Sequence, residues 1–326
     1  MRGPVISDLG HVVVLAGGLS YEREVSLRSG RRVAEALRSL EVDVEVRDTD
    51  AGLLAALRAD PPDAVFPLLH GTAGEDGAIR DILELLNVPY IGADPDACRI
   101  AWDKPTAKAV VRSAGLLTPE SVALPKEIFH DLGATAVLDR IVERLGLPLF
   151  VKPARGGSAL GAGLVQDAAD LPAAMVGCFA YGDTALIERF IVGTEVAVSV
   201  MEAEHGPVAL PPIEIVAAGG RYDYAARYES GGTEFITPAR LAEATTSTVA
   251  EASLTAHRAL GLRDLSRTDL IVDAAGVVHF LEVNVAPGMT ETSLFPAALT
   301  AAGLDLARVS RDLLARAVSR ETTLPG

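Results

Sequence analysis

The chain has 326 residues, of which 49% are hydrophobic, and a formal net charge of −15 at pH 7. This length allows two or three domains with a large core, and the hydrophobic content excludes a disordered protein. The acidic charge argues against nonspecific binding to nucleic acid or to an anionic membrane. No apolar run approaches the ~20 residues that span a bilayer, and the N-terminus lacks a signal-peptide core, so we expect a cytoplasmic protein.

The first hundred residues alternate between predicted strands and helices. The apolar or alternating runs that predict strands are 11–15, 42–46 and 64–69. The segments that predict helices are 24–40, 53–57 and 78–86. This order predicts an open parallel α/β domain over residues 1–104, in which ligands gather at the carboxyl ends of the strands.

The pattern changes after residue 104, and two further domains are expected, with boundaries at 105–195 and 196–326. The predicted elements of the central domain are a helix to residue 114, strands at 148–152, 162–165 and 185–188, and helices at 138–145 and 168–176. The predicted elements of the last domain are a strand-rich stretch at 195–216, helices at 241–260 and 306–318, and a hairpin between them.

The hairpin carries a candidate metal site. Residues 266–272 and 277–284 read as its strands, and pairing of Asp273 with Val278 would place Asp269 opposite Glu282. Glu282 and Asn284 are two residues apart and share a face. Two carboxylates and an amide, without Cys or His, suit a hard cation such as Mg²⁺ that keeps positions open for phosphate oxygens. The alternative is a hairpin with ordinary solvated acidic residues.

A Gly-rich segment at 153–161 follows a strand that ends in Lys152. Neither a P-loop nor a complete G-x-G-x-x-G motif is present, which argues against P-loop and nicotinamide enzymes. Backbone N–H groups of a small-residue loop between two strands can close over phosphates, with Lys152 as a fixed cation. A plain Gly-rich hairpin is the alternative.

Together, these segments resemble the ATP-grasp ligases, and within them the D-alanine–D-alanine ligases, over nearly the whole chain. The segments that carry the resemblance are 17–27 (GGLSYEREVSL), 69–71 with 74–77 (LHG, GEDG), 102–104 (WDK), 150–153 (FVKP), 222–224 with 227–228 (YDY, RY), 267–269 (RTD) and 282–284 (EVN). The resemblance implies an N-terminal parallel α/β domain followed by a two-part ATP-grasp fold. It also implies an enzyme that phosphorylates one D-alanine with ATP and joins the acylphosphate to a second D-alanine, for peptidoglycan synthesis.

The resemblance also implies roles for particular residues. Lys104, Lys152 and Ser158 would bind ATP phosphates. The adenine would be held by Glu188, Arg189 and Ile191, and the ribose by Glu195. Asp269, Glu282 and Asn284 would bind two Mg²⁺ ions, for which Mn²⁺ can substitute.

On the substrate side, the resemblance places Glu22 against the ammonium of the first D-alanine and His70 near the substrate carboxyl groups. Arg267 and the backbone N–H of Gly288 would stabilise the tetrahedral oxyanion. The residues expected to receive the second carboxylate are Ser293 and Leu294. The residues expected in the loop that covers the site are Arg227 and Tyr228, with Tyr228 hydrogen-bonded to Glu22 and Ser158.

Three departures from the family pattern bear on substrate identity. Arg227 replaces the family's usual Lys, Ala159 replaces a Ser, and Val285-Ala286 replace more polar residues. The alternatives are a homologous ligase that joins other amino acids and a non-catalytic nucleotide-binding regulator. The paired carboxylates could also suggest a glycosidase, although a phosphate-loop Lys does not fit that chemistry. The expected partners are ATP and D-alanine, and the sequence leaves the oligomeric state open, with a homodimer as one candidate.

Overall fold

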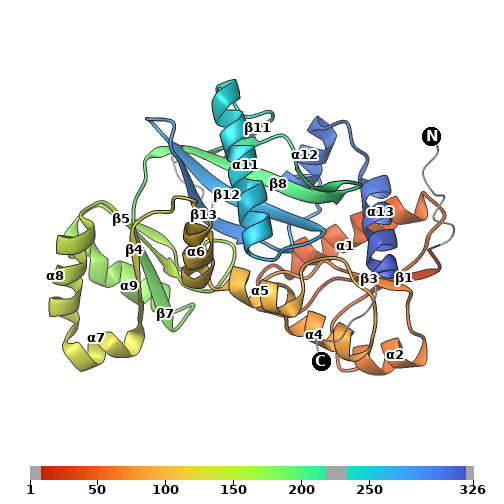
Figure 1. Cartoon of the computed structure of the whole chain (residues 1–326). Helices are drawn as coiled ribbons and strands as arrows, with labels where there is room; N and C mark the ends of the chain where they lie inside the picture. Colours follow the sequence, from red (N-terminus) through yellow and green to blue (C-terminus); the bar gives the residue numbers. More distant parts are fainter. Residues whose placement is uncertain (1–8, 218–232, 321–326) are drawn as a thin grey trace.

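The computed structural model describes residues 9–217 and 233–320, which form three β-sheets surrounded by helices (Figure 1). The strands of the N-terminal sheet are parallel, and those of the other two sheets are antiparallel. Within the described ranges, no helix is long and apolar enough to cross a bilayer. The expected mixed α/β class is confirmed: a parallel sheet at the N-terminus is followed by two antiparallel sheets.

The N-terminal sheet has the order β2-β1-β3. Its strands are β1 (His11–Leu15), β2 (Asp43–Arg47) and β3 (Ala64–Pro67). The helices of this part are α1 (Arg23–Arg38), α2 (Leu53–Ala59), α3 (Thr72–Glu75), α4 (Ala78–Leu85) and α5 (Pro95–Trp102). The sequence-based expectation lacked α3 and α5. A signal for α5 was present, because Asp94 caps this helix by accepting the Ala97 N–H and Pro95 starts its first turn.

The central sheet has the order β4-β7-β5-β6. Its strands are β4 (Ser121–Pro125), β5 (Leu149–Pro153), β6 (Gly163–Val165) and β7 (Thr184–Arg189). The helices that accompany it are α6 (Lys104–Ser113), α7 (Lys126–Leu132), α8 (Ala134–Leu145), η1 (Ala168–Asp170) and α9 (Leu171–Phe179). The sequence-based expectation missed β4 and α7. Both have a partly exposed surface and therefore lack a strong apolar period.

The large sheet has the order β11-β10-β8-β12-β13, and β9 pairs with β8. Its strands are β8 (Gly193–Ala203), β9 (Gly206–Ala209), β10 (Ile213–Ala217), β11 (Thr233–Ile236), β12 (Leu265–Asp273) and β13 (Val278–Asn284). The long helix α11 (Glu243–Ala259) lies across one face of this sheet (Figure 1).

Alternation along β12 separates a core face from a polar face. Leu270 and Val272 are buried in a hydrophobic cluster with residues of α5, α6 and α11. Arg267 and Asp269 have the opposite parity and line two cavities. The period of two in this strand therefore fixes which side chains are available for chemistry.

The C-terminal helices α12 (Leu294–Ala301) and α13 (Leu306–Ser319) return to the N-terminal part of the chain. In Figure 1 the blue α13 lies beside the red α1, and the two helices share a hydrophobic cluster that also contains residues of β1 and the large sheet. The first and last parts of the chain are thus packed together. The boundaries at 104 and 195 stay predictions.

The hairpin of β12 and β13 pairs differently at its turn from the expected arrangement. Val272, not Asp273, lies opposite Val278, so that part of the prediction is wrong by one residue. A register shift after Asp269 leaves Leu281 without a direct partner and restores the expected pairing of Asp269 with Glu282. The bulge is the physical reason that the two carboxylates still meet.

Candidate active site

Two cavities of about 510 and 520 Å³ adjoin each other at the junction of the three sheets. Both are lined by Lys104, Glu282 and the Gly156-Gly157 turn. Lys104 Nζ donates to Gly156 O at 2.6 Å and lies 3.6 Å from Glu282 Oε2. One cation and one carboxylate therefore mark the place where ligands in the two cavities would meet.

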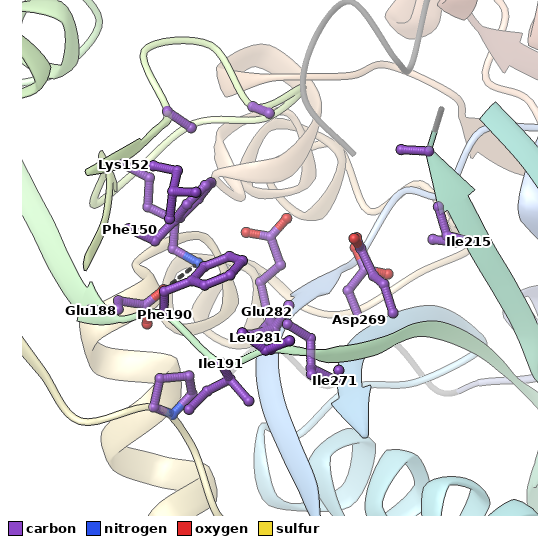
Figure 2. Close-up of a pocket in the computed structure, with 18 of the residues that line it drawn as sticks. Phe150, Lys152, Glu188, Phe190, Ile191, Ile215, Asp269, Ile271, Leu281 and Glu282 are labelled. Atoms are coloured by element: carbon purple, nitrogen blue, oxygen red, sulfur yellow. Dashed lines mark ion pairs between the residues drawn. The ribbon is translucent and has the colours of Figure 1, made fainter. Parts of the chain in front are cut away.

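The first cavity lies between the central and large sheets and has mainly apolar walls on one side (Figure 2). The rings of Phe150 and Phe190 have centroids 6.3 Å apart and are tilted by 34°. Ile191, Ile271 and Leu281 also line this part of the cavity. A flat, apolar slot beside charged groups is suited to an aromatic base that carries phosphates.

The charged wall of this cavity contains Glu188, which is buried between two lysines. Lys152 Nζ lies 2.8 Å from Glu188 Oε2, as the dashed line in Figure 2 marks, and Lys108 is ion-paired with the other carboxylate oxygen. Burial acts to raise the pKa of Glu188, but both lysines oppose it and hold that pKa below its usual range. Glu188 thus fixes the Lys152 ammonium inside the cavity.

The two lysines respond differently to burial. Burial lowers the pKa of Lys108 to about 8, although Glu188 acts in the other direction. For Lys152, burial is outweighed by Glu188 and then Glu282, so that its pKa is raised. Lys152 is therefore held as a cation at neutral pH, as a phosphate-binding group must be.

The loop from Gly156 to Gly161 has an unusual backbone. Ser158 and Ala159 both adopt a left-handed conformation, with φ of 55° and 54°, and Gly161 has φ of 70°. Such a conformation is costly for residues with a side chain and persists where the surroundings enforce it. The Ser158 hydroxyl donates a hydrogen bond to Glu22, which supplies part of that constraint.

Of the three predicted oxygen ligands on the hairpin, Asp269 and Glu282 line the first cavity, and Asn284 lines the second. Figure 2 shows the Asp269 and Glu282 side chains directed into the first cavity. Asn284 pairs with Arg267 two residues further along the hairpin, and its Oδ1 accepts the Ala286 N–H at 2.7 Å. Two carboxylates and an amide oxygen form a donor set that fits Mg²⁺. Within the described ranges, no group of three or more His, Cys, Asp or Glu residues offers a competing site.

Arg267 connects the two cavities. Its guanidinium donates to both carboxylate oxygens of Asp269, at 2.7 and 2.8 Å. Asp269 lines the first cavity and Arg267 the second. This bidentate pairing restricts both side chains.

The second cavity contains the sequence-predicted substrate residues. The members that line it are Glu22, His70, Ser158, Arg267, Asn284, Gly288, Ser293 and Leu294. Burial lowers the pKa of His70, and a backbone hydrogen bond to Ala286 holds the ring. The imidazole is therefore neutral at pH 7. Its Nε2 atom is buried and has no hydrogen-bond partner among the described residues.

At the far end of this cavity, Ser293 precedes α12 and is held by Thr290. Its Oγ accepts the Thr290 N–H at 3.0 Å and lies 2.8 Å from Thr290 Oγ1. A Cβ atom added to Gly288 would lie 2.8 Å from Ser293 Oγ, so a larger residue there would displace the hydroxyl. The absence of a side chain at Gly288 keeps this end of the cavity open.

Glu75 is a site residue that the sequence reasoning missed. It is buried, lines the second cavity, and accepts the Gly71 N–H at 2.8 Å. Burial, followed by the charge of Glu22, raises the pKa of Glu75 to about 8. At pH 7 the side chain is thus a neutral acid close to two charged groups, Lys104 and Arg267.

Other residues of the first cavity were only partly anticipated. Arg189, Ile191 and Glu195 line it as expected, but the Arg189 guanidinium is engaged by Leu145 O and Glu120, which do not line the cavity. The cavity residues missed by sequence reasoning are Phe150 and Phe190, and Lys108, which pairs with Glu188 without lining the cavity, was also missed. Phe150 belongs to the matched segment 150–153, and Phe190 lies between the predicted residues Arg189 and Ile191, which was the available signal. Arg227 and Tyr228 lie outside the described residues.

Comparison with protein families gives two matches. Residues 110–315 match the model described as "D-ala D-ala ligase C-terminus", and residues 47–93 match "D-ala D-ala ligase N-terminus". Among curated proteins, a D-alanine--D-alanine ligase of Anaeromyxobacter dehalogenans is 44% identical over 90% of this chain and 92% of its own length. One from Bordetella petrii is 40% identical over 97% and 95% of the two chains.

Solved structures give the same grouping. The VanG D-Ala:D-Ser ligase from Enterococcus faecalis superposes with a TM-score of 0.82 and 28% identity, covering 95% of this chain and 100% of its own. A D-alanine--D-alanine ligase from Bacillus anthracis complexed with ATP gives a TM-score of 0.78 and 28% identity, with 95% and 97% coverage.

Proposed function

Because the chain belongs to the D-alanine–D-alanine ligase family, we propose that its two adjoining cavities carry out the two successive steps by which two D-alanines are joined. The chain is an ATP-dependent ligase that forms D-alanyl-D-alanine, and the family's product serves the cell wall. The single observation that supports assigning the two steps to adjoining cavities is that both cavities are lined by Lys104 and Glu282.

In this proposal the first cavity holds ATP. The adenine lies in the slot of Phe150, Phe190 and Ile191, and Glu195 contacts the ribose. Lys152, fixed by Glu188, and Lys104 contact the phosphates together with the backbone of the loop at Ser158. The γ-phosphate then points to the junction of the cavities, where the carboxylate of the first D-alanine attacks it and ADP leaves.

Asp269, Glu282 and Asn284 are proposed to bind Mg²⁺, with two ions per site and Mn²⁺ as a substitute. When bound, Mg²⁺ supplies positive charge that offsets the charge of the phosphates. Arg267 limits the freedom of Asp269 through two hydrogen bonds. The protein thus holds the acceptor oxygens ready before the nucleotide enters.

The second cavity is proposed to hold both D-alanines. Glu22 binds the ammonium of the first, and His70 lies near the substrate carboxyl groups. The amine of the second D-alanine, after losing a proton, attacks the acylphosphate carbon, and inorganic phosphate leaves as the peptide bond forms. Arg267 and the Gly288 N–H stabilise the oxyanion between these events, while Ser293 and Leu294 receive the second carboxylate. Arg227 and Tyr228 are proposed to complete the site.

The proposal is tested by the products that the purified protein forms. ADP release should require Mg²⁺ and D-alanine, and mass spectrometry should identify D-alanyl-D-alanine. D-Serine, D-lactate and a panel of L-amino acids, offered singly and with D-alanine, test for a ligase that joins other substrates. The D-Ala:D-Ser ligase among the structural neighbours makes D-serine the most informative competitor. Preference for D-serine over D-alanine as the second substrate would overturn the D-alanine assignment.

Two further properties belong to the proposal. A cytoplasmic location follows from the need for ATP and free D-alanine, and fractionation of cells that express the chain tests it. A homodimer is the proposed assembly, and sedimentation of the purified protein at several concentrations tests that state.

A further inference from the structure

The loop from Gly156 to Gly161 contacts the N-terminal part of the chain through Glu22. Ser158 Oγ donates to Glu22, and a Cβ atom added to Gly157 would lie 3.2 Å from Glu22 Oε2. This contact holds the inner side of the loop, which faces the proposed junction of ATP and the first D-alanine. Glu22 thus contacts the loop at Gly157 and Ser158.

A tyrosine ring covers that Gly161 end. A Cβ atom added to Gly161 would lie 2.8 Å from Tyr181 Cδ2, so the ring is in direct contact with the loop backbone. Tyr181 follows α9 and precedes β7, and its N–H donates to Cys178 O at 3.0 Å. The ring is therefore mounted on the central sheet and its helix, like the loop that it covers.

The N-terminal part of the chain reaches the same ring through Tyr21. The rings of Tyr21 and Tyr181 have centroids 6.4 Å apart and an interplanar angle of 67°, an edge-to-face arrangement. Such pairs are stabilised by their ring electrostatics beyond the area that they bury. Tyr21 is 80% exposed, so its ring has little other packing to account for its position. Glu22, the next residue, makes the inner contact.

Two consecutive residues thus lie near opposite ends of the loop: Glu22 contacts Ser158 directly, and Tyr21 contacts the Tyr181 ring that covers Gly161. We propose that Tyr21 is a positioning residue, which acts through Tyr181 to hold the Gly161 end of the loop against the N-terminal part of the chain. Because Glu22 also binds the first D-alanine, the tyrosine pair strengthens the coupling between the binding of the nucleotide and the binding of that substrate. This inference rests on the proposed function of the two cavities.

The coupling can be measured by calorimetry without turnover. The probe is the non-hydrolysable ATP analogue AMP-PNP with Mg²⁺, and its Kd is determined with and without saturating D-alanine. We expect D-alanine to tighten AMP-PNP binding in the unchanged protein. In Tyr21→Ala the ratio of the two Kd values should fall by about threefold to tenfold, as expected for loss of one aromatic pair. Tyr21→Phe keeps the ring and should keep the ratio.

Two further variants make the interpretation specific. Tyr181→Ala should reduce the ratio as Tyr21→Ala does, and the double variant should show no further loss, because both changes remove one contact. Leu19→Ala is the matched control, since Leu19 is an apolar residue of the same turn, 98% exposed, and should leave the ratio unchanged.

An unchanged ratio in Tyr21→Ala, additive losses in the double variant, or no coupling in the unchanged protein would each overturn the inference. Formation of D-alanyl-D-alanine by the unchanged protein is assayed separately. A ligase that makes the dipeptide but shows no effect of Tyr21 therefore contradicts the positioning role alone.

Discussion

Asp269 and Glu282 lie directly opposite each other on β12 and β13, although the turn that joins these strands would set them out of register. The bulge after Asp269 restores the alignment, and both side chains line the nucleotide-sized cavity. Lys104 approaches Glu282 to 3.6 Å from the N-terminus of α6. The charge of Glu282 should therefore matter both for the proposed Mg²⁺ and for Lys104, the lysine proposed to bind phosphate.

Glu282→Gln preserves the shape of this side chain and removes its charge. We expect turnover to fall by at least ~100-fold at saturating ATP and Mg²⁺, which is the scale of loss for an electrostatic group in an active site. ADP release is the measurement. Glu243→Gln, an exposed change at the start of α11, is the control and should leave turnover unchanged. Near-normal turnover in Glu282→Gln would contradict the metal assignment.

Phe190→Ala opens one wall of the proposed adenine slot. We expect the KM for ATP to rise by about tenfold or more, because a stacked ring loses its partner, while kcat changes much less since the reacting atoms are elsewhere. The matched control is Phe129→Ala, which breaks the edge-to-face pair with Phe179 in the same part of the molecule but does not line the cavity. Equal effects of both changes on the KM would count against a slot at Phe190.

Glu75 predicts a dependence of stability on pH in the absence of ligands. Its pKa is raised from 4.5 to about 8, so the folded chain keeps a proton that the unfolded chain releases near pH 4.5. This contribution to stability is complete below pH 4.5 and is lost as pH rises toward 8. Glu75→Gln removes the effect and can still accept the Gly71 N–H.

Thermal unfolding of Glu75→Gln and the unchanged protein should be compared between pH 5 and 9. We expect the variant to gain in relative stability as pH rises, by at least about 1 kcal/mol over this range. The exposed change Glu35→Gln is the control. A difference that does not vary with pH would show that Glu75 is ionised in both states.

His257 predicts the opposite dependence. Burial, with Arg258 nearby, lowers the pKa of His257 from 6.5 to about 4, and Nδ1 lies 2.8 Å from Ser266 Oγ. As pH drops, His257 binds a proton near pH 6.5 in the unfolded chain but only near pH 4 in the folded chain. The free energy of unfolding therefore falls as pH drops between these values. We expect a loss on the order of 2–3 kcal/mol from this residue.

His257→Gln should therefore show a shallower loss of Tm between pH 7 and 5 than the unchanged protein, even if the variant is less stable at pH 7. The exposed His205→Gln serves as a control for histidine content. Parallel curves of Tm against pH for His257→Gln and the unchanged protein would contradict the lowered pKa of His257.

Features that depend on local pattern could be predicted from the order of the amino acids alone. Continuous apolar runs predicted β1 and β3, because strands covered on both faces have no polar side. The types of side chain on the hairpin predicted an oxygen-donor site, and Lys152 with its Gly-rich loop predicted phosphate binding. How these parts fit together could not be predicted in this way, because contacts between distant segments depend on how the sheets pack and on strand irregularities that sequence periodicity does not reveal.

Particular residues illustrate this division. The bulge that aligns Asp269 with Glu282 arises from the joint geometry of two strands. Lys108 meets Glu188, and Tyr21 meets Tyr181, only because separate parts of the chain are packed together. Burial of Glu75 depends on the elements that close around it, and the pKa of a carboxyl group responds to that burial rather than to its sequence neighbours.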